Sequence, residues 1–206
     1  VAPIYNGGAL IGNVTFLPGN GKTLVLVNEH ILNGLQERKM FSHELSFGTL
    51  RTPVCATLCS ADDKWTVTLS SKKKHSCELV LASEDLYAGV IPISISGLTR
   101  FLVGTPKEND HIQMFAGMSK GYCAVSSGRV LTVEEKSIRH NATTNDGWCG
   151  GLLTMQMAGV KCPLRAVGIH TAGNTVFGNR AILLTSLPQN CLSFLMLGTQ
   201  PSAGSH

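Results

Sequence analysis

A cysteine between glycines is the strongest chemical signal in the sequence. The run GWCGG at residues 147–151 lets the chain turn tightly, which exposes the sulfur of Cys149 and directs backbone N–H groups toward one point. We therefore predict that Cys149 is a nucleophile and that the N–H groups of Gly147 and Cys149 form an oxyanion hole. A glycine-rich hairpin with a buried cysteine is the alternative, because unpaired cysteines are often buried.

A thiol nucleophile needs a base, and the sequence contains seven histidines. His30 directly follows a strand-like run at residues 23–29, so we expect it at the rim of a barrel, where a strand ends and a cleft can begin. We predict that His30 is the base. Three other histidines lie in polar, basic or terminal segments and are expected to be solvated: His43, His75 and His206.

A third residue should orient the imidazole and stabilise its charged form, which calls for a carboxylate at the mouth of another strand. Asp85 fits, because it enters the apolar run at residues 86–93. Glu84 is its immediate rival. Side chains of neighbouring residues in a strand point in opposite directions, so only one of the two can face His30 if the backbone is extended. We favour Asp85 and leave Glu84 open.

The three predicted residues follow the order base, acid, nucleophile, which is the order of the chymotrypsin triad. His30 and Asp85 lie in the first half of the chain and Cys149 in the second. A cleft between two structural units is therefore expected. The papain order, with the cysteine near the N-terminus and the histidine far downstream, does not fit.

Positioning these residues requires a frame of short strands. Runs rich in Val, Ile, Leu and Thr alternate with clusters of Gly, Pro, Asn and Ser, as in barrels and sandwiches, so we predict an all-β chain. Helical periodicity is limited to residues 31–37 and 191–197. The expected strands are residues 9–17, 23–27, 65–69, 78–81, 90–95, 122–125, 130–133, 152–157, 166–169 and 181–184.

The chain divides where turn formers and charges mix between two strand-rich halves. Each half is expected to form one β-barrel. The predicted parts are an N-terminal barrel at residues 1–97 with His30 and Asp85, a connector at 98–110, a C-terminal barrel at 111–197 with Cys149 and His170, and a mobile tail at 198–206.

Composition narrows the class of protein. The chain has 206 residues, is 43% hydrophobic and 15% charged, and contains no apolar run long enough to span a membrane, which excludes a disordered chain and an integral membrane protein. The net charge of +4 is too small to indicate a nucleic-acid binder by itself. Seven cysteines, an odd number, and no leader segment predict a reducing compartment.

Two short patterns carry less weight. Cys55 and Cys59 lack a second ligand pair at zinc spacing, so no metal site is expected, and the proposed chemistry needs no cofactor. Residues 13–15 match the acceptor pattern for N-glycosylation, which has no consequence for a chain outside the secretory path.

Three segments together resemble the signature segments of picornavirus 3C-type cysteine proteases: LVLVNEHI around His30, TTNDGWCGGLL around Cys149 and VGIHTAGN around His170. The resemblance spans most of the chain in order and spacing. It implies two six-stranded-type antiparallel β-barrels of the chymotrypsin type with minor short helices. It also implies a viral endopeptidase that cleaves polyproteins after Gln in the host cell cytoplasm or at viral replication complexes, with host proteins as further substrates.

The resemblance also assigns the residues that read the substrate. His170 then lines the primary specificity pocket and donates to the side-chain amide of the substrate glutamine, and Thr144 helps to hold the same side chain. A neutral imidazole offers one N–H donor, which suits an uncharged amide oxygen. Without the resemblance, His170 would compete with His30 as the base.

Two further features of the family are less clearly matched. Residues 120–133 resemble the β-ribbon that folds over the substrate cleft, with residues 126–128 as its turn. Many relatives bind viral RNA through a basic connector segment, where this chain has Arg100 but lacks the usual flanking charges. An RNA-binding or replication-complex docking module on the same fold is therefore the alternative function, with lysines 72–74 as a second basic patch.

Overall fold

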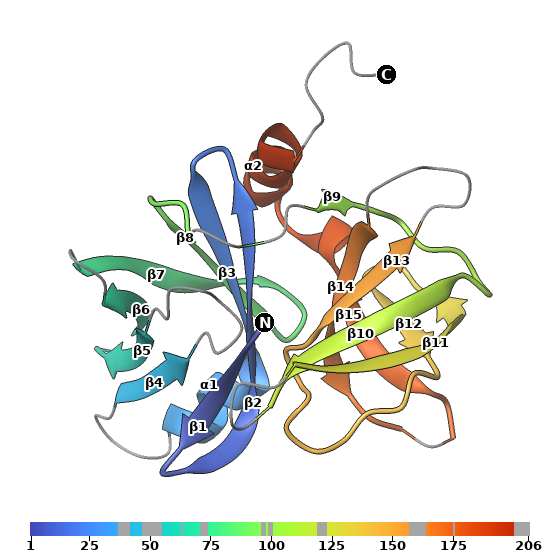
Figure 1. Cartoon of the computed structure of the whole chain (residues 1–206), viewed down its shortest axis with the longest axis horizontal. Coiled ribbons are helices and arrows are strands. Elements are labelled where there is room, and N and C mark those ends of the chain that lie inside the picture. Colours follow the sequence, from blue (N-terminus) through green and yellow to red (C-terminus); the bar gives the residue numbers. More distant parts are fainter. Residues whose placement is uncertain are drawn as a thin grey trace.

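The computed structural model describes residues 1–36, 42–46, 55–62, 64–70, 74–95, 98, 101–118, 123–156, 164–174 and 176–199. Its described residues form two β-sheets that lie side by side, with two short α-helices and one 3-10 helix (Figure 1). This arrangement confirms the predicted all-β fold of two antiparallel barrel units with minor helices. No helix in the described ranges has the length and apolar character needed to cross a bilayer.

The first sheet is a closed barrel with the strand order β1-β2-β3-β8-β7-β6-β5-β4. It closes because Ile4 of β1 pairs with Leu45 of β4. Helix α1 (Glu29–Gln36) follows β3 directly and packs its apolar face on the barrel core. The strands are β1 (Ala2–Asn6), β2 (Ala9–Gly19), β3 (Lys22–Asn28), β4 (Ser42–Ser46), β5 (Cys55–Ala61), β6 (Lys64–Ser70), β7 (Lys74–Ser83) and β8 (Leu86–Ile91).

The second sheet has the order β13-β10-β11-β12-β15-β14-β9. Because β13 also pairs with β14, six of its described strands form a ring, and β9 adds to the outside in parallel with β14. The strands are β9 (Leu102–Val103), β10 (His111–Gly117), β11 (Cys123–Val133), β12 (Ser137–His140), β13 (Leu152–Gln156), β14 (Leu164–Ala172) and β15 (Asn179–Leu183).

The run LVLV in β3 is apolar at every position because both faces of this strand are buried. Side chains alternate along a strand, so Val25 and Val27 point into the first barrel while Leu24 and Leu26 point toward the second. Leu24 and Leu26 join a cluster with residues of β13, β14, β15 and helix α2 (Gln189–Thr199): Leu152, Ile169, Ile182, Leu192 and Leu195. This shared apolar cluster joins the two sheets.

One predicted turn is wrong. Residues 126–128 lie inside the continuous strand β11, where they pair with Met114, Gln113 and Ile112 of β10. Gly128 serves close packing there, because a Cβ at this position would lie 2.4 Å from the backbone nitrogen of Ala142. The glycine that suggested a turn is instead required for close approach of the chain.

Two segments of the predicted division contain secondary structure that the sequence did not predict. Strand β9 lies within the segment predicted as the connector. Helix α2 continues through Thr199, so the first two residues of the predicted tail are helical, and residues 200–206 lie outside the described residues.

Candidate active site

Cys149 lies in the loop at residues 141–151 between β12 and β13, called the nucleophile loop below. Two glycines allow the shape of this loop. Gly147 has φ +88° and Gly150 has φ +92°, which are conformations that residues with a side chain rarely adopt. Within the loop, the Trp148 N–H donates to the Asn145 carbonyl at 3.2 Å, and the Gly151 N–H donates to the Trp148 carbonyl at 3.0 Å. The loop is therefore held by its own backbone as well as by its neighbours.

Strand β2 of the first barrel donates hydrogen bonds to the carbonyl groups of this loop. The side-chain amide of Asn13 donates to the Gly147 carbonyl at 2.9 Å, and its backbone N–H donates to the Cys149 carbonyl at 2.7 Å. The Thr15 hydroxyl donates to the Gly150 carbonyl at 2.7 Å. Asn13 and Thr15 are both fully buried, so the glycosylation pattern at residues 13–15 serves packing between the barrels.

Among the backbone N–H groups of residues 147–151, two have no hydrogen-bond partner in the described part of the chain. The carbonyl groups of the loop are occupied from residue 147 to residue 150, and the Trp148 N–H is occupied as well. Within the described part of the chain, no hydrogen bond engages the N–H groups of Gly147 and Cys149. These are the two donors that the sequence predicted for an oxyanion hole.

His30 and Asp85 come together although 55 positions separate them. His30 is the second residue of α1, and its Nδ1 is 2.7 Å from Asp85 Oδ2. Asp85 lies in the turn between β7 and β8 with φ +48°. Its backbone carbonyl accepts from the Glu29 N–H and its Oδ1 accepts from the His30 N–H, so Asp85 also caps the helix N-terminus.

The two carboxylates of this turn have different partners. Glu84 forms an exposed ion pair with Arg180 of β15, while Asp85 faces His30. The expected alternation of an extended strand does not apply, because both residues lie in the turn and Asp85 adopts a left-handed conformation. The structure thus brings Asp85, and not Glu84, to the imidazole.

These contacts shift the pKa values of both partners. The hydrogen bond with Asp85 and, next, the one with the Cys149 side chain raise the pKa of His30 to about 10, against the opposing effect of burial. Burial by itself would raise the pKa of Asp85, but hydrogen bonds from the His30 ring, the Thr171 hydroxyl and the His30 backbone outweigh it and lower this pKa. Both shifts favour an ion pair of imidazolium and carboxylate.

Thr171 and Asn28 complete the site and were not singled out in the sequence. The Thr171 hydroxyl donates to Asp85 Oδ2, and its carbonyl accepts from the Cys149 thiol at 3.4 Å. The Asn28 side chain donates to the same carboxylate at 3.4 Å. Thr171 directly follows the predicted pocket residue His170, so its position beside that motif is the one signal that could have found it.

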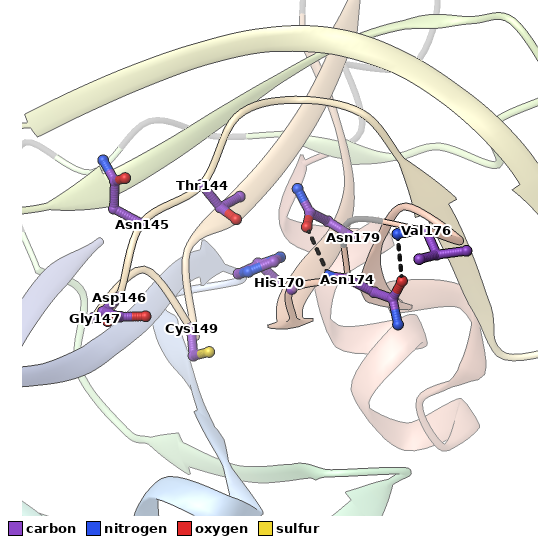
Figure 2. A pocket seen from close by; sticks show the side chains of 10 residues that line it. Thr144, Asn145, Asp146, Gly147, Cys149, His170, Asn174, Val176 and Asn179 are labelled. Atoms are coloured by element: carbon purple, nitrogen blue, oxygen red, sulfur yellow. Dashed lines mark hydrogen bonds between the residues drawn. The ribbon is translucent and has the colours of Figure 1, made fainter.

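A cavity of about 690 Å³ opens beside Cys149 (Figure 2). It is lined by the nucleophile loop on one side and by β14 and the loop after it on the other. Thr144, Cys149 and His170 all reach this cavity, so the structure brings together the residues predicted to read the substrate and the predicted nucleophile.

His170 is neutral at ordinary pH. Burial, followed by the charges of His140 and His30, lowers the pKa of His170 to about 3, with an opposing hydrogen bond to the Arg180 backbone. The His140 ring meets the His170 ring edge to face, with centroids 5.6 Å apart, and burial lowers the pKa of His140 to about 4. The cavity is therefore lined by one uncharged imidazole, that of His170, which packs against a second uncharged imidazole, that of His140.

The basic residues predicted as an RNA contact fall mainly outside the described part of the chain. Arg100 and lysines 72 and 73 lie outside the described residues. Across the ranges that the structure covers, no group of three or more His, Cys, Asp or Glu side chains is arranged to hold a metal ion.

Comparison with solved structures identifies the fold. The serine protease domain of the Sesbania mosaic virus polyprotein matches with a TM-score of 0.54 and 16% identity, over 89% of this chain and 87% of that chain. The MamO protease domain from Magnetospirillum magneticum matches with a TM-score of 0.51 and 15% identity, over 93% of each chain.

The HtrA-type protease AlgW, in complex with a decapeptide, matches with a TM-score of 0.51 and 17% identity, over 91% of this chain and 52% of that chain. This chain thus spans about half the length of AlgW. No protein-family model and no curated protein matches the sequence. At these identities the likeness establishes the two-barrel, chymotrypsin-like fold.

Proposed function

We propose that this protein is a cysteine endopeptidase that cleaves peptide bonds after glutamine. The observation that carries the proposal is that the Cys149 thiol and the His30–Asp85 pair converge on Thr171, whose carbonyl accepts from the thiol and whose hydroxyl donates to Asp85, beside two free backbone N–H groups. A nucleophile, a base with an orienting carboxylate and oxyanion donors are the parts that acyl transfer requires. The fold is also that of solved proteases from several sources, which supports the same reaction class.

At the start of the reaction the Cys149 proton resides on the His30 imidazole, because the hydrogen bond with Asp85 raises the pKa of His30. Asp85 stabilises the imidazolium that results, and the imidazolium in turn stabilises the thiolate. The thiolate attacks the carbonyl carbon, and the N–H groups of Gly147 and Cys149 receive the oxyanion. His30 then returns its proton to the leaving amine, and water, deprotonated by His30, hydrolyses the thioester to regenerate the thiol.

The preference for glutamine follows from a cavity whose described lining residues include the acidic Asp146 but no lysine or arginine. A neutral His170 offers an N–H donor to the amide oxygen of a glutamine side chain, and Thr144 adds a hydroxyl. A glutamate carboxylate would enter this cavity without a cation to pair with among the described lining residues, which costs desolvation energy. Such a site favours the amide over the acid.

Polyprotein processing is the biological setting that fits best. The three segments around His30, Cys149 and His170 resemble those of picornavirus 3C-type proteases. One structural neighbour is the protease domain of a viral polyprotein, which supports this setting. The proposed substrates are accordingly viral polyprotein junctions, with host proteins in addition.

A fluorogenic peptide library that varies the residue before the scissile bond tests the proposal. We expect cleavage after Gln by the wild type and none by Cys149→Ala. We expect His170→Ala to lose the preference for Gln over Glu while it keeps a thiol that reacts with iodoacetamide. If folded wild-type protein cleaves no peptide, the proposal is wrong, and salt-dependent RNA titration then tests the docking alternative.

A further inference from the structure

The side chain of Asn13 connects the first barrel to the nucleophile loop at Gly147, one of the two predicted oxyanion donors. It lies in β2 and is fully buried. Its Nδ2 donates to the Gly147 carbonyl at 2.9 Å, and its Oδ1 accepts from the Gly117 N–H at 2.7 Å. Gly117 is the last residue of β10, so one side chain of the first barrel binds two separate segments of the second.

The partners of Asn13 fix the orientation of its amide. A carbonyl accepts only, and an N–H donates only, so Oδ1 must face Gly117 and Nδ2 must face Gly147. The fit is also tight, because a Cβ on Gly117 would lie 2.9 Å from Asn13 Oδ1 and 2.7 Å from Pro3 Cδ. No other side chain of this size has a donor and an acceptor at these two places.

The bond to Gly147 acts on the peptide plane between the two predicted oxyanion donors. This plane carries the Gly147 carbonyl at one edge and the Trp148 N–H at the other. Asn13 holds the carbonyl, and the Asn145 carbonyl holds the N–H. Gly147 has φ +88°, and a glycine can adopt other backbone conformations at little cost. Without the bond from Asn13, only the 3.2 Å bond from the Trp148 N–H to the Asn145 carbonyl holds this plane, so it rotates more easily and can turn its carbonyl toward the site.

We propose that Asn13 is a positioning residue that holds the oxyanion hole in its active conformation across the barrel interface. The proposal rests on the proposed peptidase function for its kinetic effect. Asn13 is fully buried, so it acts through Gly147 and not by touching the substrate. It acts by keeping the Gly147 carbonyl away from the oxyanion, so that the N–H groups on either side of that plane converge.

Thr15 gives the matched comparison. It lies two residues further along β2, is equally buried, and donates across the same interface to the same loop. Its acceptor, the Gly150 carbonyl, lies beyond both predicted donors. Thr23 is a second control, because its buried hydroxyl donates to the Ile93 carbonyl at 2.8 Å within the first barrel.

The kinetic test compares Asn13→Ala with Thr15→Val and Thr23→Val. For Asn13→Ala we expect kcat on a Gln peptide to fall about 10²-fold, the loss typical of one oxyanion donor, with a much smaller change in KM. Alkylation by iodoacetamide needs the thiol and its base but no oxyanion hole, so its rate should stay near that of the wild type. Thr15→Val should lose less in kcat, and Thr23→Val should keep the wild-type value.

Two kinetic results would overturn the proposal. One is a fall in alkylation as large as the fall in kcat, because the variant would then have lost the nucleophile itself. The other is an equal loss of kcat in Asn13→Ala and Thr15→Val, because any hydrogen bond across the barrel interface would then have the same kinetic effect.

A second measurement does not depend on turnover. In the Cys149→Ala background, adding Asn13→Ala should move the backbone amide NMR signals of Gly147 and Trp148 and speed the hydrogen exchange of the Trp148 amide. Adding Thr15→Val should leave these signals in place. Unchanged signals in the Asn13 variant would refute the inferred role, even if the wild type cleaves no peptide and the proposed function has failed separately.

Discussion

Asp85 and Glu84 are adjacent carboxylates with different surroundings, and this difference gives the first prediction. Asp85→Asn removes the charge that stabilises the His30 imidazolium, so we expect kcat/KM for a Gln peptide to fall about 10²-fold. Glu84→Gln breaks only an exposed ion pair with Arg180, so activity should persist and stability should change by less than about 1 kcal/mol. Steady-state kinetics and urea unfolding of both variants measure these effects. A larger kinetic loss in Glu84→Gln would reverse the assignment.

The raised pKa of His30 gives a prediction about stability and pH. The folded protein holds the His30 proton up to about pH 10, whereas the unfolded chain releases it near its ordinary value of 6.5. The stabilising contribution is therefore complete below about pH 6.5 and is lost as the pH rises through about 10. Between these limits the native state binds the extra proton, so the free energy of unfolding should fall with rising pH.

Asp85→Asn isolates this contribution, because it removes the largest cause of the shift. We expect the free energy of unfolding to fall less steeply in Asp85→Asn than in the wild type between about pH 7 and 9, measured by urea unfolding at each pH. Parallel slopes for the two proteins would show that the Asp85 carboxylate does not hold the His30 proton.

At the scale of the element, the nucleophile loop is shaped by the strand that it packs against. Gly150 has φ +92°, and a Cβ there would lie 2.0 Å from the Asn13 carbonyl oxygen in β2. Gly150→Ala must therefore push the loop away from the first barrel, and we expect loss of both activity and stability. Gly21→Ala is the control, since Gly21 has φ +74° and a Cβ added there would meet no atom within 4 Å.

The two variants separate the energetic cost of a positive φ from the cost of a steric clash with β2. Gly21→Ala should cost about 1 kcal/mol, the cost of the unfavourable φ alone, and keep full activity. Gly150→Ala should cost clearly more in urea unfolding and lower kcat. Equal costs for the two variants would mean that the loop does not need close contact with β2.

At the scale of the whole molecule, the apolar cluster between the barrels should make them unfold together. Each barrel carries one buried tryptophan, Trp65 in the first and Trp148 in the second. The single-tryptophan variants Trp148→Phe and Trp65→Phe therefore report on one barrel each. In each variant, fluorescence and far-UV circular dichroism should give coincident urea transitions.

Leu26→Ala tests the cluster itself. Leu26 is fully buried and points from β3 toward the second sheet, so its truncation should cost about 2–5 kcal/mol. Both tryptophan reporters should shift to lower urea together. A shift of the Trp65 signal alone would mean that the two barrels unfold independently.

Several features of this protein follow from the sequence because their causes are local. Alternating apolar runs bounded by turn residues predict strands, and the all-β class was confirmed. The glycines around Cys149 predict a tight loop, which the positive φ values of Gly147 and Gly150 bear out. By contrast, the glycine at position 128 led to a wrong prediction of a turn, because this glycine is required for close contact with Ala142 in the loop after β12.

The tertiary structure alone decided which polar groups meet at the site. The sequence by itself predicted a thiol, an imidazole and two rival carboxylates, but the turn conformation of Asp85 determines which carboxylate faces His30. The bonds from Thr171 to Asp85 and from Asn13 to Gly147 join positions that are 86 and 134 residues apart. A side chain has a few fixed donors and acceptors, and which of them find partners depends on how distant strands pack, which local pattern does not encode.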